Sequence, residues 1–149
     1  MFCRAVVCCA LAISVAQLGC SRVPDGHRKV TGQVLMIDGQ PLQGLKGPAV
    51  VRFDPVDPEV RETRESIGML DESSGDFVVM TYSGGDGVPL GDYKVVITME
   101  KYEENYKIVP DPFTHYETTP WTVTVSADGS NHFELQLTEP PKEDEKQKD

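Results

Sequence analysis

The chain has 149 residues, enough for one domain with a modest core, and its 24 acidic and 14 basic residues give a formal charge of −10. This charge repels phosphate backbones, so we expect no nucleic-acid partner. The 13 Gly and 11 Pro residues indicate many turns, which in a short chain favours a β fold.

The first residues are typical of a secretory signal peptide. Arg4 supplies a positive charge, and an apolar run of small and aliphatic residues follows from Ala5 to Ala16. A run of this length is too short for a permanent transmembrane helix, which needs about twenty apolar residues. The sequence therefore predicts a signal peptide over residues 1–19.

The motif Gln17-Leu18-Gly19-Cys20 ends this signal. It resembles the lipobox of bacterial lipoproteins, and the resemblance implies cleavage before Cys20 and lipid attachment to its thiol. Gln17 departs from the pattern, and Ser14-Val15-Ala16 offers an alternative cleavage site after Ala16. We expect an exported protein held in the cell envelope by a lipid anchor, on the periplasmic or the outer face. The membrane leaflet stays open.

The cysteines and the segment after them fit this organisation. All four cysteines lie in the first twenty residues, so a disulfide framework and a cysteine-based metal site are excluded from the domain that follows. The polar residues 20–27 are predicted to form a flexible tether.

From Arg28 onwards, short apolar or alternating segments are closed by Gly, Pro, Asp or Asn, a pattern typical of strands joined by turns. The predicted strands are Lys29–Ile37, Ala49–Phe53, Arg64–Leu70, Asp76–Thr81, Gly91–Glu100, Pro120–Ser126 and His132–Leu137. The third and fourth are expected to form a hairpin. Alternation places two sets of residues each on one face of their strand: Val30, Gly32, Val34 and Met36; and Tyr93, Val95, Ile97 and Met99. In the last strand, Phe133, Leu135 and Leu137 are predicted to point inward.

These strands predict an all-β domain over residues 28–138, folded as a two-sheet antiparallel sandwich. The remaining residues, 139–149, begin with a Pro-Pro pair and are then almost entirely charged. Such a composition predicts a disordered tail, because it offers little apolar surface to repay the entropy of ordering.

Several short motifs occur in an order that resembles the carboxypeptidase regulatory-like, transthyretin-like domains. They are Thr31-Gly32-Gln33-Val34, Gly39-Gln40-Pro41-Leu42, Val50-Val51-Arg52-Phe53, Asp71 through Gly75-Asp76-Phe77, Gly91-Asp92-Tyr93-Lys94-Val95, and the closing Val123 to Leu137. With the signal sequence, the order is similar to that of small lipoproteins abundant in planctomycete bacteria. The resemblance spans Val30 to Leu137 and implies a seven-stranded antiparallel Greek-key sandwich in a non-catalytic exported module. Fold alone does not give function.

We expect no catalytic site and no cofactor. The three histidines are His27, His115 and His132. Ser83, His115 and Asp111 are residues of the types found in a hydrolase triad, but no Gly-x-Ser-x-Gly motif supports that role.

We also expect no metal site. The acidic stretch Asp71–Asp76 lacks the ligand spacing of a calcium loop, so it is interpreted as a hairpin turn, and Asp86 between two glycines is interpreted as a turn residue.

The segment Glu100–Thr119 is a long connection without periodicity. Its candidate binding aromatics are Tyr102, Tyr106, Phe113 and Tyr116, with His115 beside them. They either bind an envelope protein or a carbohydrate, or only cover an open end of the sandwich. Two functions therefore stay open, a binding module and a structural envelope lipoprotein without a ligand, with a transthyretin-like hydrolase as a remote third. The sequence leaves the ligand and the oligomeric state open.

Overall fold

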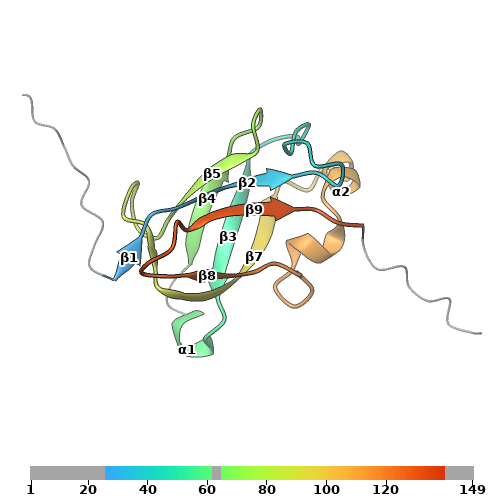
Figure 1. The fold of residues 1–149 in the computed structure, drawn as a ribbon. Coiled ribbons are helices and arrows are strands. Elements are labelled where there is room, and N and C mark those ends of the chain that lie inside the picture. Colours follow the sequence, from blue (N-terminus) through green and yellow to red (C-terminus); the bar gives the residue numbers. More distant parts are fainter. Residues whose placement is uncertain (1–25, 62–64, 140–149) are drawn as a thin grey trace, which may run out of the picture.

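The computed structural model describes residues 26–61 and 65–139 (Figure 1). The predicted signal peptide, the lipidation site at Cys20, most of the tether and nearly all of the charged tail lie outside these residues. The elements are β1 (His27–Arg28), β2 (Val30–Leu35), β3 (Ala49–Pro55), α1 (Pro58–Arg61), β4 (Ser66–Leu70), β5 (Asp76–Met80), β6 (Val88–Pro89), β7 (Gly91–Met99), α2 (Glu103–Ile108), the 3-10 helix η1 (Asp111–Thr114), β8 (Thr122–Val125) and β9 (His132–Gln136).

The predicted all-β class is confirmed. Each predicted strand has a counterpart in one seven-stranded sheet of order β8-β7-β3-β4-β5-β2-β9, and β1 and β6 form a separate two-stranded ladder. The predicted hairpin of β4 and β5 is present, with Ile67 opposite Met80 and Leu70 opposite Phe77.

The arrangement of the strands differs from the prediction in one pair. β2 and β9 run parallel, from Thr31 opposite His132 to Leu35 opposite Gln136, so the sheet is mixed rather than purely antiparallel. The two sheets of a Greek-key sandwich are likewise not confirmed, because the seven strands are continuous. Alternating burial looks the same in parallel and antiparallel strands, so the sequence pattern carried no information on the direction of this pair.

The sheet curls around its core. Its edge strands β8 and β9 are brought to the same side, as Figure 1 shows, and the indole Nε1 of Trp121 donates a hydrogen bond to the carbonyl of Gln136 at 3.1 Å. The turn between them is held by Asn131, whose side chain accepts from the N–H of Ser126 and donates to its carbonyl. This curvature brings the two edges near each other, although no ladder joins β8 and β9 in the described residues.

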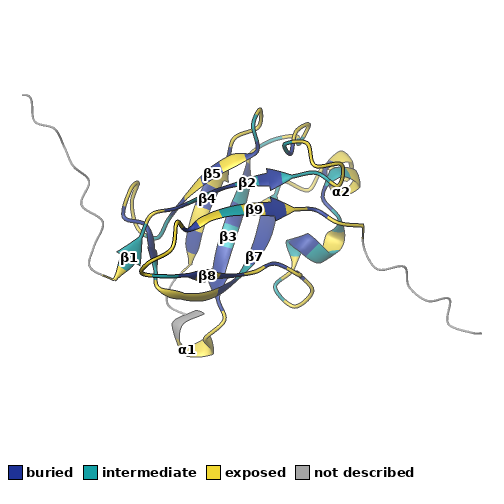
Figure 2. Cartoon of the chain, in the orientation of Figure 1, coloured by how far each residue is buried: buried dark blue, intermediate teal, exposed yellow. Residues whose placement is uncertain are grey.

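Phe53 on β3 is a centre of the core. Its ring centroid lies 6.1 Å from those of Phe77 and Tyr93 and 6.2 Å from that of Phe133. Figure 2 shows the buried residues concentrated along the strands. At the two ends of the domain, Pro58 and Glu59 of α1 are exposed, and α2 is exposed except for the buried Asn105 and the half-buried Ile108.

The residues that alternation placed on one face of β2 and of β7 lie in or against the core, as do the residues predicted to point inward from β9. Val30, Gly32 and Val34 are buried on β2, and Tyr93, Val95 and Ile97 on β7. Met36, Met99 and Phe133 are only partly buried but pack against the same core. Val96 is also buried, although it lies on the other face of β7. The period of two therefore placed the core residues correctly.

Two connections between strands contain helical turns. The connection over residues 100–119 holds α2 and η1, and the Asp57-Pro58 segment opens α1. α2 has six residues and α1 and η1 four each, which is too short for a helical period to be visible in the sequence. Within the part of the chain that the structure describes, no helix is long and apolar enough to cross a membrane.

Candidate interaction surface

The structure separates the four candidate aromatics of the 100–119 segment. Phe113 is 1% exposed, and its ring centroid lies 4.6 Å from that of Trp121, so it belongs to the core and is not available to a partner. Tyr116 is half-buried against β7. Tyr102 and Tyr106 remain exposed, and a hydrogen bond to Glu100 raises the pKa of Tyr102 above its usual value. The four residues therefore do not form one binding platform.

Asn105 ties this segment to the body of the domain, a role the sequence analysis did not foresee. Its side chain is fully buried and accepts a hydrogen bond from the N–H of Lys46 at 2.8 Å. It also donates to the carbonyls of Lys46 and Glu100. A salt bridge of 2.8 Å between Lys46 and Glu104 reinforces the contact and lowers the pKa of Glu104. α2 is thus anchored by side-chain contacts at the end of the sheet.

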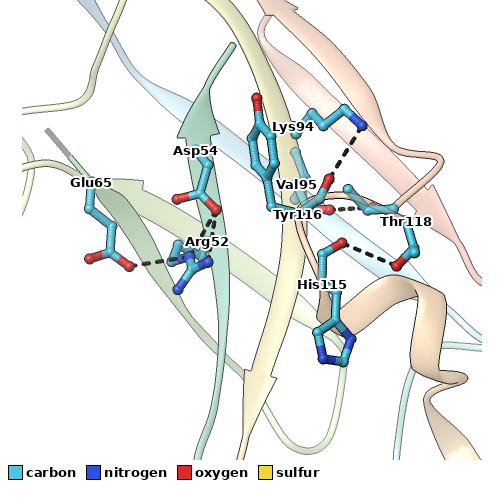
Figure 3. A network of polar contacts seen from close by, with 9 residues as sticks. Arg52, Asp54, Glu65, Lys94, Val95, His115, Tyr116 and Thr118 are labelled. Carbon is cyan, nitrogen blue, oxygen red and sulfur yellow. Dashed lines mark hydrogen bonds and ion pairs between the residues drawn. The ribbon is translucent and has the colours of Figure 1, made fainter. Parts of the chain in front are cut away.

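A polar network connects the same segment to the outer face of β3 and β7 (Figure 3). Arg52 pairs with Asp54 at 2.9 Å and with Glu65 at 3.3 Å. Lys94, the cross-strand neighbour of Asp54, donates to the carbonyl of Tyr116 at 3.3 Å and lies 5.3 Å from the centre of its ring.

This network borders a hollow of about 310 Å³ lined by Arg52, Asp54, Glu65, Tyr116 and Glu117. The guanidinium group of Arg52 already has two carboxylate partners, and the ammonium group of Lys94 is occupied by Tyr116. Both cationic side chains of the network therefore interact with groups of the domain itself, which leaves them poorly placed to bind an anionic ligand. The arrangement explains how residues 115–119 are held over the sheet.

The structure does not bring Ser83, His115 and Asp111 together as a catalytic triad. His115 lies 3.7 Å from Asp111 through Nδ1, with both side chains exposed, while Ser83 lies in another loop, where its N–H donates to Asp86. No hydrogen bond between Ser83 and His115 is present in the described residues. A group of three or more metal-ligating side chains is also absent from that part of the chain.

The acidic loops act as turns, as the sequence indicated. The Asp71 carboxylate accepts from the hydroxyl and N–H of Ser73 and from the N–H of Ser74, and these bonds lower its pKa to about 2. The buried Asp86 accepts from the N–H groups of Thr81, Tyr82 and Ser83 at 2.6–3.1 Å. Burial opposes its ionisation, but the three donors outweigh that penalty and its pKa lies below the usual 3.8.

The most distinctive surface lies on the outer face of β4 and β5. Burial alternates along both strands, and apart from Asp76 at the start of β5 the outward positions are apolar. Met69 and Val78 face each other across the ladder and are 53% and 51% exposed, and Ile67 is exposed beside them. Two half-buried apolar residues, Val50 opposite Met69 and Met80 opposite Ile67, extend the group. We call Val50, Ile67, Met69, Val78 and Met80 the apolar face.

Charged groups border the apolar face at two sides. A hollow of about 350 Å³ beside Met69 and Val78 includes Asp71 and Asp76, and Arg52 with Glu65 lies next to Ile67. Contiguous exposed apolar groups with a polar border are typical of interaction sites.

A sequence signal for the apolar face was present but was not interpreted. The run Phe77-Val78-Val79-Met80 is apolar at four successive positions, as is typical of a strand covered on both faces.

No known family model matches the chain, and comparison with curated proteins and with solved structures found no significant match.

Proposed function

We propose that this protein is an exported lipoprotein of the bacterial cell envelope, anchored through Cys20, whose β domain binds another envelope component through the apolar face. The N-terminal signal and the lipobox-like motif support the anchor. The order of the strand motifs supports kinship with the transthyretin-like, carboxypeptidase regulatory-like domains. We further propose that the protein is not an enzyme.

The observation that carries the binding role is the position of Met69, Val78 and Ile67. Each of them is exposed, although it lies on a central strand of the sheet rather than at an edge or in a loop. Fully burying a Val, Met or Ile side chain stabilises by about 1.5–3 kcal/mol. These three side chains are 38–53% exposed, so a partner that covers them would recover roughly half of that from each.

A purely structural role is the second candidate. The anchored Asn105 and the buried Phe113 favour it for residues 100–119, because this segment covers one end of the sheet rather than presenting its aromatic residues together. These observations do not account for the apolar face, so we rank the binding module first.

Cysteine labelling measures directly whether the apolar face is covered in the cell. The described domain contains no cysteine, so Met69→Cys introduces one reporter there. Glu134→Cys, on the exposed side of β9, is the matched control. Each variant is labelled with a maleimide in intact envelopes and as purified protein.

We expect Met69→Cys to label at least about tenfold more slowly in envelopes than in the purified protein, because covered interface positions are desolvated. The control should label equally in both. Equal labelling of Met69→Cys in the two preparations would refute the binding role.

A further inference from the structure

A hollow lies at the end of the domain that carries α1. Its volume is about 550 Å³, and Pro55, Val56, Pro58, Pro89, Leu90 and Tyr93 line it. Val56 and Leu90 are exposed large apolar residues. Its two carboxylates are engaged, since Asp57 accepts from the N–H of Glu59 and Asp92 from the hydroxyl of Thr124. The hollow therefore offers an apolar rim rather than a cation site.

The chain enters the domain beside this hollow. The N–H of Leu90, one of the rim residues, donates to the carbonyl of Gly26 at 3.1 Å. β1 continues from that point along β6, with His27 opposite Pro89. Figure 1 shows β1 and α1 towards the left and bottom of the domain, and α2 at the opposite end.

A third exposed apolar group belongs to the loop that leads into this strand pair. Tyr82, 70% exposed, belongs to the loop between β5 and β6. That loop packs on β1, because a Cβ on Gly87 would meet the carbonyl of Arg28 at 2.5 Å. Tyrosine is one of the residues enriched where protein meets the membrane–water interface.

The distance from the anchor limits which end of the domain can reach a membrane. Gly26 is the sixth residue after Cys20, so an extended chain spans at most about 20 Å between them. A compact domain of this length is about 35 Å across. If the end with α2 faced the membrane, Gly26 would lie about 35 Å from the membrane, farther than the chain from Cys20 can span. The domain therefore cannot dock on the membrane through the end that carries α2.

We propose that the end of the domain carrying Val56, Leu90 and Tyr82 contacts the lipid surface. The inference rests on the anchor at Cys20 proposed above, and it assigns the remaining faces, including the apolar face, to the aqueous side. The formal charge of −10 favours zwitterionic over anionic lipid as the surface that is touched.

The test uses the full lipidated protein, purified from membranes and reconstituted into phosphatidylcholine vesicles with a nitroxide on the lipid head group. Leu90→Cys and Val56→Cys carry a bimane fluorophore in separate preparations. Met69→Cys is the matched control, since Met69 is a similarly exposed apolar residue near the other end of the sheet. Thermal melting of each variant verifies the fold.

An apolar side chain at a membrane surface lies about 5–10 Å into the head-group boundary, so we expect emission roughly twofold lower at positions 90 and 56 than at 69. Equal quenching at all three positions, or none at any of them on vesicle-bound protein, would overturn the lipid contact while leaving the anchor intact. Protein that fails to remain with the vesicles would contradict the anchor and therefore both proposals.

Discussion

Gly32 is a residue for which the packing of the sheet leaves no space for a side chain. A Cβ built there would lie 2.2 Å from the carbonyl oxygen of Phe133 and 2.4 Å from the Phe77 ring. The first of these is backbone of the neighbouring strand and cannot rotate away. Gly32→Ala should therefore lower the free energy of unfolding by about 1–3 kcal/mol, measured by urea denaturation.

The control for this prediction is Gly84→Ala. A Cβ at Gly84 meets nothing within 4 Å, so this variant should match the wild type within about 0.5 kcal/mol. A Gly32→Ala protein as stable as the control would show that β2 does not pack against Phe77 and β9 as described.

Asp86 links the stability of the β5–β6 loop to pH. Its pKa in the folded protein lies below 3.8, so its contribution is fully present above about pH 4 and is lost as the pH falls through the folded-state value. Asp71, with a pKa of about 2, contributes with the same sign. Asp86→Asn removes the charge that three N–H groups face, so it should cost about 1–3 kcal/mol at pH 6.

Urea unfolding of wild type and Asp86→Asn from pH 6 to pH 2 measures this contribution. The two stability curves should converge as the pH falls, because protonation removes the same charge from the wild type. Curves that remain parallel over the whole range would contradict the role of Asp86.

The positions of the strands could be predicted from the sequence better than which strands pair with one another. β7 was predicted to within one residue of its end, because the alternation of Tyr93, Val95 and Ile97 reflects one buried face. The parallel pairing of β2 with β9 was not foreseen, since it joins segments about a hundred residues apart through backbone bonds that any residue can make. α2 was missed because tertiary contacts of Asn105, rather than a helical period, hold it.

Asn105→Ala tests the anchoring of α2. The variant leaves the N–H of Lys46 and the carbonyls of Lys46 and Glu100 without their side-chain partner, at an expected cost of about 1–3 kcal/mol. Hydrogen exchange should accelerate most over residues 100–109, because the loss is local.

Tyr106→Ala on the same helix is the control, because Tyr106 is 43% exposed and its removal should change exchange little. Equal exchange in the Asn105 variant and this control would show that α2 is held by other contacts.

Across the whole molecule, neither the burial of the candidate aromatic residues nor the apolar face could be predicted from the sequence. A tyrosine or phenylalanine in a long segment does not reveal its own burial, and Phe113 proved to be core while Tyr102 remained exposed. The apolar face needed the register of β3, β4 and β5, which brings Val50, Met69 and Val78 into one row. Residues distant in sequence become one surface only through that register.

The proposed lipid anchor at Cys20 would hold the domain at a membrane. The most direct measurement is the intact mass of the protein extracted from membranes of an expressing bacterium, for the wild type and for Cys20→Ala. We expect a wild-type chain that begins at Cys20 and carries acyl chains, and a mutant without them. A wild-type chain that begins after Ala16 and carries no lipid would contradict the anchor.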